Sequence, residues 1–224
     1  MSLRTMRVQG RFTFLGLGLG LSAAMSLAAT GCMTETAETP DETLGSQALD
    51  LTPAITLSVS QNACASNVAQ NYFQITNNTA APIALSDLTI KYWINDTSGK
   101  NVVPSVYYAG CVTTANGTCV HQVTGTAASS TSFTACGPSP TQQANWEISV
   151  APTDHGTIAP GSKWNGVQTA INLQNYGAFS PGSSTWFSGC ASGKPYAPNV
   201  NFALYYQGAL VSGTPPSCRA PASD

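Results

Sequence analysis

The chain has 224 residues, of which 8 are Lys or Arg and 10 are Asp or Glu, so that its formal net charge is only -2. About a quarter of the residues of an ordinary soluble protein are charged, against 8% here; the scarcity of basic residues excludes a nucleic-acid binder, which needs clustered Lys and Arg against phosphates. The hydrophobic share of 42% is sufficient for a buried core, and the length indicates one domain with additional segments.

The chain begins with the pattern of a secretory signal peptide over residues 1–31. Three arginines precede an apolar stretch rich in Leu, Gly and Ala, and small residues follow it up to Cys32. This ending resembles the lipobox of bacterial lipoproteins, although Ala29 stands where the box usually has Leu. We therefore expect an exported lipoprotein, anchored to a membrane through a lipid on Cys32, in the outer membrane or at the cell surface. Ordinary cleavage that leaves Cys32 as a free thiol is the alternative.

Residues 32–50 are expected to form a lipidated, acidic and disordered tether. This stretch has no aromatic residue and carries half of the acidic residues of the chain, so that it cannot bury enough apolar surface to fold. The following part, residues 51–218, has four acidic residues and four lysines and is therefore nearly uncharged. A neutral, hydroxyl-rich partner such as a polysaccharide suits this domain better than a polyion. Residues 219–224 are expected to be a short tail.

Hydrophobic residues recur with a period of two along the domain, which is the pattern of half-buried strands. No segment after Asp50 has helical periodicity, and Asn-Thr, Asn-Gly and Pro-Gly pairs mark turns. We therefore expect an all-β fold, a two-sheet antiparallel β-sandwich of the jelly-roll type. The alternation predicts strands over residues 55–60, 73–75, 88–95, 146–150 and 202–206, with a turn at 207–208 and a last strand at 210–211.

Six cysteines remain when Cys32 is set aside, an even number in a chain with an export signal. We expect three disulfides, which restrict the unfolded state of a charge-poor, loop-rich domain. Six cysteines allow fifteen connectivities, and their spacing does not select one. A zinc site is the alternative, for which only His121 lies near a cysteine in sequence. The six residues are Cys64, Cys111, Cys119, Cys136, Cys190 and Cys218.

Three stretches of the domain have a distinctive order of strands and turns. Tyr72 to Asp96 contains a strand, an Asn-Thr turn and an Asp-Leu-Thr-Ile-Lys-Tyr strand; Trp146 to Trp164 contains a Glu-Ile-Ser strand and a Pro-Gly turn; Asn199 to Pro216 contains Tyr-x-Gly-x-Leu-Val-x-Gly. Together they resemble the family 3 carbohydrate-binding modules, the β-sandwich domains that attach to cellulose in bacterial cellulase systems. The resemblance implies a sandwich that binds a polysaccharide, and it concerns the fold more than the binding residues.

The residues with which this family binds cellulose are not carried over. In its cellulose-binding members, an Asp-His pair, a Tyr, an Arg and a Trp form a flat strip on one sheet. Here the Asp-His position falls near Gly110-Cys111, the Arg position near Thr169 and the Trp position at Leu173. Binding to crystalline surfaces is therefore expected to be weak, and any stacking residues lie elsewhere.

A structural calcium ion is also common in the family, held by oxygen ligands from the loop after the Tyr strand and from a Ser-Asn-Asp run before the next strand. Asn95 and Asp96 match the first half of this set, whereas residues 179–182 replace the second half. Because calcium takes about six to eight oxygen ligands, we expect no cofactor, with structural calcium as an open alternative.

Candidate sugar-binding residues are aromatic side chains on the outer faces of the sandwich, because the apolar faces of pyranose rings stack on them. Alternation places Trp93 outside the core; burial under a loop or under the segment between Asn101 and Asn145 is the alternative. Tyr107 and Tyr108 point in opposite directions in a regular strand, so that one of them faces outward. The full set is Trp93, Tyr107, Tyr108, Tyr176 and Trp186, whereas Trp146 and Trp164 are assigned to the core or its rim.

Catalysis is not expected. A glycosidase needs two carboxylates about 5 to 10 Å apart, and the domain has only Asp87, Asp96, Glu147 and Asp154. Asp154 and His155 are the only neighbouring acid and histidine, and the sequence has no nucleophile elbow or phosphate loop. We therefore expect a monomeric, non-catalytic module that binds a neutral polysaccharide, with cellulose or a related β-glucan favoured. The alternative is a structural or protein-interaction lipoprotein whose sandwich has lost sugar binding.

Overall fold

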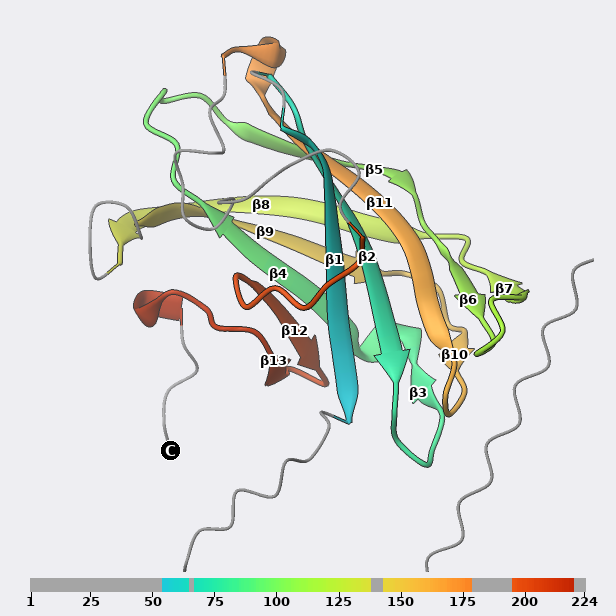
Figure 1. Cartoon of the computed structure of the whole chain (residues 1–224). Helices are drawn as coiled ribbons and strands as arrows, with labels where there is room; N and C mark the ends of the chain where they lie inside the picture. The colour runs from blue at the N-terminus through green and yellow to red at the C-terminus, as the bar shows by residue number, and fades with distance from the viewer. Residues whose placement is uncertain (1–53, 65–66, 138–142, 179–194, 220–224) are drawn as a thin grey trace, which may run out of the picture. The chain divides into compact units, whose positions relative to one another are not determined.

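Two antiparallel β-sheets carry most of the described residues (Figure 1). The computed structural model describes residues 54–64, 67–137, 143–178 and 195–219, and of residues 62–64 the backbone alone. These residues belong to one unit of the chain, Gln47–Asp224. The two sheets confirm the all-β, antiparallel sandwich expected from the alternation of hydrophobic residues.

The first sheet, called here the β2 sheet, has 6 strands in the order β1-β2-β11-β6-β7, and β5 also pairs with β11. β2 takes one edge of β11, so that β5 and β6 share the other edge, β5 along residues 168–173 and β6 along residues 163–165. The strands are β1 (Ile55–Cys64), β2 (Ala69–Asn77), β5 (Val102–Tyr108), β6 (Cys111–Thr113), β7 (Cys119–Gln122) and β11 (Lys163–Leu173).

The second sheet, called the β4 sheet, has 5 strands in the order β13-β12-β4-β9-β8. Its strands are β4 (Leu88–Ile94), β8 (Thr126–Cys136), β9 (Ala144–Pro152), β12 (Phe202–Tyr206) and β13 (Ala209–Ser212). A small third sheet pairs β3 (Ile83–Ala84) with β10 (Thr157–Ile158). The described helices are short 3-10 turns at Leu85–Asp87, Gln174–Tyr176 and Ser217–Arg219.

The hydrophobic core lies between the two large sheets. Every second residue of β2 is buried, and the ring of Phe73 packs against Tyr92 of β4 and Phe202 of β12, at centroid distances of 6.0 and 5.8 Å. Trp164 is fully buried in the same cluster, and Trp146 packs against it. The assignment of both tryptophans to the core or its rim is therefore confirmed.

Two disulfides lie among the described residues. Cys111 and Cys119 close the β6–β7 hairpin, and Cys136, at the end of β8, is joined to Cys218 in the last 3-10 helix. Cys190 and the side chain of Cys64 lie outside the described residues, so that a third disulfide stays a prediction.

The N-terminal predictions also fall outside the described residues. The signal peptide over residues 1–31, the anchor at Cys32 and the tether over 32–50 are not covered. In the part of the chain that is described, no helix is long and apolar enough to cross a membrane.

Candidate binding face

Trp93 is fully buried and is not available to a sugar. Alternation places it on the outer face of the β4 sheet, but that face is itself covered by other side chains. The expectation that Trp93 is exposed is therefore wrong, because alternation fixes only the side of the sheet. The side chains around it are Ala144 and Ala203, both buried, with Phe133, Tyr205 and Leu210 packed against them.

Polar groups complete the cover over Trp93. Glu147 of β9 accepts hydrogen bonds from Trp93 Nε1 at 3.2 Å and from Lys91 Nζ at 2.9 Å. Arg219 lies over the ring of Phe133, 4.3 Å from its centroid, and its Nε is 3.7 Å from a Glu147 oxygen. Arg219, expected in the tail, therefore packs on the domain. We call this surface the covered face; its residues are Lys91, Trp93, Phe133, Glu147, Tyr205, Leu210 and Arg219.

Tyr107 and Tyr108 are both exposed, at 51% and 45%. Gln168 of β11 pairs with Tyr108, whereas the next residue, Thr169, pairs with Val106, so that a bulge leaves Tyr107 without a partner across the strand. A bulge breaks the alternation of side chains. The expectation that only one of the two rings faces outward is therefore wrong, and both are accessible.

Tyr176 is 64% exposed but lies apart from Tyr108. It belongs to the 3-10 helix that follows β11. Between Gln168, which lies opposite Tyr108, and Leu173 at the end of the strand, β11 runs for about 17 Å. Tyr176 is therefore not part of the surface around Tyr108. Trp186 lies outside the described residues, and its role stays a prediction.

Tyr72 of β2 is an outward ring that the sequence analysis did not include. Its neighbours Asn71 and Phe73 are fully buried, so that the Tyr72 side chain points to the outer face. Gln168 lies opposite Tyr72 on β2 and opposite Tyr108 on β5. The three side chains therefore form one row across β2, β11 and β5.

Tyr196 extends this row beyond β1. The backbone of Ala197 exchanges hydrogen bonds of 2.8 and 3.1 Å with Val59, on the edge of β1 that β2 leaves open. Burial, followed by the nearby Tyr72 phenol, raises the pKa of Tyr196. Tyr196 and Tyr72 are therefore neighbours at one end of the row, with Tyr108 at the other.

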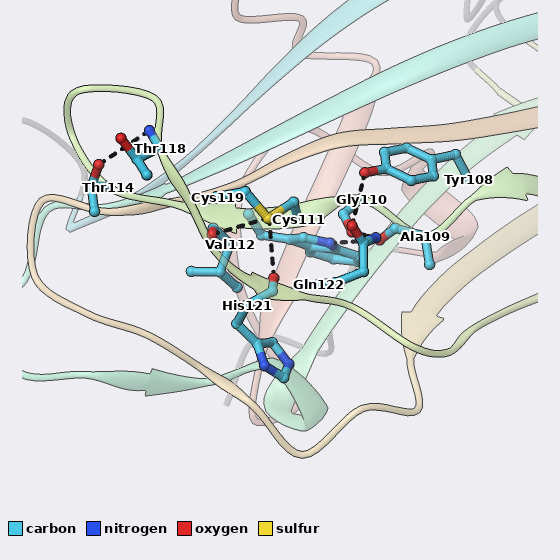
Figure 2. Close-up of a disulfide and its surroundings, with 11 residues drawn as sticks. Tyr108, Ala109, Gly110, Cys111, Val112, Thr114, Thr118, Cys119, His121 and Gln122 are labelled. Atoms are coloured by element: carbon cyan, nitrogen blue, oxygen red, sulfur yellow. Dashed lines mark hydrogen bonds between the residues drawn. A yellow bond between two sulfur atoms is a disulfide. The ribbon is translucent and has the colours of Figure 1, made fainter.

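A second row of outward side chains consists of amides. Asn165 of β11 lies opposite Gln74 of β2, and Gln74 Nε2 donates to Asn165 Oδ1 at 2.9 Å. Gln122 of β7 accepts a hydrogen bond of 3.2 Å from the hydroxyl of Tyr108 (Figure 2). The two rows adjoin, and we call them together the tyrosine–amide face. Its residues are Tyr72, Gln74, Tyr108, Gln122, Asn165 and Gln168.

The tyrosine–amide face is almost uncharged. Lys163 is the charged residue next to it, with its Nζ 3.4 Å from Gln74 Oε1. The six strands of the β2 sheet contain no Asp or Glu. Neutral donors and acceptors beside the exposed ring of Tyr108 and the half-buried ring of Tyr72 suit a ligand with many hydroxyl groups, because amides both donate and accept hydrogen bonds.

The positions that would carry the family's cellulose-binding strip face inward or are blocked. Thr169 and Leu173 are fully buried on β11, and Gly110 and Cys111 are buried, with Cys111 in a disulfide. The outward residue next to Thr169 is Gln168, which belongs to the tyrosine–amide face. A binding surface of this chain is therefore composed of other residues than the family's strip.

All four carboxylates of the domain have intramolecular partners. The pairs are Asp87 with Gln207, Asp96 with Ser98, Glu147 with Lys91 and Asp154 with Thr124. Asp96 Oδ2 accepts hydrogen bonds from both the amide and the hydroxyl of Ser98 in a turn. No group of three or more His, Cys, Asp or Glu suited to a metal ion occurs among the described residues. Residues 179–182 lie outside them, so that structural calcium stays an open alternative.

Asp154 is buried and pairs with His121 rather than with its sequence neighbour His155, which is exposed. It accepts the backbone N–H groups of Thr124 at 2.9 Å and Gly156 at 2.6 Å, and His121 Nε2 is 2.8 Å away. These contacts, led by the two backbone hydrogen bonds, hold the pKa of Asp154 well below its usual value. The carboxylate thus ties the segment after β7 to the segment between β9 and β10.

The described residues thus form a β-sandwich that presents a nearly uncharged face of rings and amides, with the carboxylates of the domain engaged in structural contacts. The sequence profile of the family described as cellulose binding domain matches residues 55–213, and the chain belongs to this family. The membership confirms the resemblance to the family 3 modules. It supports carbohydrate or cellulose binding without catalysis.

Solved structures show the same fold. The chain is similar to the CBM3a-L domain from the scaffoldin cipA of the Clostridium thermocellum cellulosome, with 19% identity and a TM-score of 0.62 over 73% of this chain and 92% of that chain. It is also similar to the family 3b module from a Bacteroides cellulosolvens cellulosome scaffoldin, with 21% identity and a TM-score of 0.56 over 74% and 98% of the two chains. A family IIIa domain from Clostridium cellulolyticum matches with 20% identity and a TM-score of 0.56, over 73% and 98%. No curated protein matches this chain.

The sequence contained a signal for part of the tyrosine–amide face. The alternation that assigns Phe73 and Ile75 to the core also assigns Tyr72 and Gln74 to the outside. Gln168 had no such signal, because the turn-forming residue Gly166 interrupts the pattern of β11.

Proposed function

We propose that the chain binds a neutral polysaccharide, cellulose or a related β-glucan, through the tyrosine–amide face. The observation that carries the proposal is the position of Tyr72 and Tyr108 on opposite sides of Gln168. Two strand spacings separate the two tyrosines, about 10 Å. This separation is close to the length of the disaccharide repeat of a β-1,4-linked glucan, so that one extended chain laid across the strands meets both rings.

The chemistry of the face supports this ligand class. Tyrosine rings stack on the apolar faces of pyranose rings, and the amides of Gln74, Asn165 and Gln168 lie beside them to bond sugar hydroxyls. A polyanionic ligand needs several cations, whereas Lys163 is the one cation that the described residues place beside this face. The family's flat strip is absent, so we expect amorphous or soluble β-glucan to bind more tightly than crystalline cellulose.

Retention of the full-length protein on insoluble polysaccharides tests the proposal. Crystalline cellulose, amorphous cellulose, chitin and xylan are compared, with a soluble β-glucan as competitor. We expect retention on amorphous cellulose that the competitor abolishes, and loss of retention in a Tyr72→Ala/Tyr108→Ala variant. A Tyr176→Ala variant is the control, since that exposed ring lies off the face.

The alternative, a structural or protein-interaction module, is favoured by the burial of Thr169 and Leu173 where the family places binding residues. Retention of folded protein on none of the four polysaccharides contradicts the proposed binding and favours this alternative.

The proposal includes attachment to a membrane through a lipid on Cys32, with the module displayed at the outer membrane or the cell surface. Its support is the signal-like segment and the small residues before Cys32. More than one acyl chain is needed for stable anchoring. A Cys32→Ser variant is expected to leave the membrane fraction or to remain unprocessed, and unchanged fractionation contradicts the anchor.

A further inference from the structure

The ring of Tyr108 is held in place at two points. One side lies over Gly166 of β11, where a Cβ atom would come within 3.6 Å of ring carbon Cε1. Gly166 has a φ of 76°, a conformation that side chains rarely adopt, and it forms the bulge of β11 next to the ring. The hydroxyl, at the other end, donates to Gln122 Oε1 at 3.2 Å.

Gln122 is itself fixed by the β6–β7 hairpin. Its Nε2 donates to the carbonyl of Gly110 at 2.7 Å, while its Oε1 accepts from Tyr108, so that both ends of the amide are used. The amide lies beside Gly110, whereas the His121 ring points away from it (Figure 2). Gly110 has a φ of 85°, and a Cβ atom there would lie 2.7 Å from the carbonyl oxygen of Asn165. Only glycine at position 110 therefore allows the backbone to present the carbonyl of residue 110 to the amide of Gln122.

The strand that carries Gln122 has little support from pairing. β7 has four residues and lies at the edge of the β2 sheet, next to β6, which has three. The disulfide between Cys111 and Cys119 joins the two strands across the hairpin, with Cα atoms 5.9 Å apart. Cys111 also lies directly opposite Gln122. One end of the covalent link is therefore the cross-strand partner of the residue that accepts the hydrogen bond from the tyrosine hydroxyl.

We infer that Gln122, on the hairpin closed by the Cys111–Cys119 disulfide, is a positioning residue that fixes the Tyr108 ring for a glycan chain. The inference rests on the proposed function of the tyrosine–amide face. A ring that is already immobile loses less conformational entropy when a sugar stacks on it, and such preorganisation raises affinity. The gain expected for one immobilised side chain corresponds to about a threefold to tenfold change in affinity.

A double-mutant cycle on the full-length protein tests this inference, with binding to a soluble β-glucan measured well below the unfolding temperature. Gln122→Met and Tyr108→Phe each remove the hydrogen bond and keep both side chains large. We expect each to weaken binding about threefold to tenfold, and the double variant to bind no more weakly than either single variant. NMR relaxation of the ring at position 108 is expected to show greater mobility in both, a change that a purely structural role of the hairpin does not produce in Tyr108→Phe.

Other outcomes overturn the inference. Weaker binding in Tyr108→Phe alone assigns the hydroxyl to direct contact with the sugar, and weaker binding in Gln122→Met alone assigns Gln122 to hairpin structure or to the ligand. If the unmodified protein binds no glucan, the proposed function fails; if it binds and both variants match it, only the inference fails.

The role of the Cys111–Cys119 disulfide in positioning Gln122 can be tested against a matched control in the same chain. A Cys111→Ser/Cys119→Ser variant is expected to bind about as weakly as Gln122→Met. A Cys136→Ser/Cys218→Ser variant, which removes the bridge on the covered face, is expected to bind as the unmodified protein does. Unchanged glucan affinity in a folded Cys111→Ser/Cys119→Ser variant removes the disulfide from the positioning device.

Discussion

The outer faces of the two sheets place aromatic side chains in opposite states. On the covered face of the β4 sheet, Trp93 has no exposed surface, whereas on the tyrosine–amide face of the β2 sheet Tyr108 is 45% exposed. Trp93 alternates with buried residues on β4, as Tyr72 of the tyrosine–amide face does on β2. The side of the sheet is therefore encoded locally, while exposure depends on what else the chain lays over that side.

A disulfide between residues distant in sequence helps to close the covered face, whereas a disulfide between near neighbours supports the tyrosine–amide face. The bridge from Cys136 to Cys218 spans 82 positions and brings Arg219 over Phe133. The bridge from Cys111 to Cys119 spans 8 positions and closes a hairpin beside exposed rings. One disulfide thus closes an aromatic surface, and the other supports an open one.

Trp93→Ala is expected to have the largest effect on stability. The side chain is fully buried, and truncation of a buried tryptophan costs about 3 to 5 kcal/mol because it leaves a cavity. Glu147 also loses the hydrogen bond from the indole. Denaturant unfolding measures the loss, and glucan binding by the folded variant is expected to be unchanged. Weaker binding with unchanged stability contradicts the assignment of Trp93 to the covered face.

Acid is expected to loosen the edge of the β2 sheet through Asp154. Its folded-state pKa is lowered, so that the stabilisation is fully present above the ordinary Asp value of about 3.9 and is lost as the pH falls below it. Asp154→Asn is expected to cost about 2 kcal/mol at pH 7, since hydrogen bonds to a charged group are removed. The difference in unfolding free energy between Asp154→Asn and the unmodified protein is measured from pH 7 to pH 3.

The gap between Asp154→Asn and the unmodified protein is expected to shrink below about pH 4. A gap that is constant with pH means that the variant acts through packing and not through the lost charge. His155→Ala is the matched control, because this histidine is exposed and lies next to Asp154 in sequence without pairing with it.

The sequence predicted the strands in which hydrophobic residues alternate without interruption. β1, β4 and β12 follow this rule. It failed for β8, which consists mostly of Ser, Thr and Ala around Phe133, and for β5, which contains Pro104 and two adjacent tyrosines. β11 was missed because the bulge at Gly166 shifts the phase between Trp164 and Val167. The candidate face includes residues of β5 and β11, which this alternation does not predict. The alternation therefore predicts only the β2 residues of the face.

Tyr108→Ala is expected to have the opposite signature to Trp93→Ala. By analogy with bases stacked on aromatic side chains, loss of one stacked ring costs about 1 to 3 kcal/mol, which corresponds to about a fivefold to 150-fold loss of affinity. The unfolding free energy is expected to change by about 0.5 kcal/mol or less, because the ring is exposed. Affinity electrophoresis in a soluble β-glucan, with Tyr176→Ala as control, separates the two quantities. Equal effects of the two alanine variants on binding contradict a site centred on Gln168.

The smallest effect is expected at the outer layer of the covered face. The guanidinium of Arg219 lies 4.3 Å from the centre of the Phe133 ring and near Glu147, in a half-exposed position where a cation–π contact contributes about 0.5 to 1 kcal/mol. Arg219→Ala is therefore expected to lower the unfolding free energy by about that amount. Arg219→Lys recovers only part of it, because an ammonium group lacks the flat surface that stacks on a ring. A loss as large as that of Trp93→Ala, measured in the same denaturant titration, would mean that Arg219 holds the cover over Trp93 in place. In that case the burial of Trp93 depends more on the C-terminal segment than on the packing of Phe133, Tyr205 and Leu210.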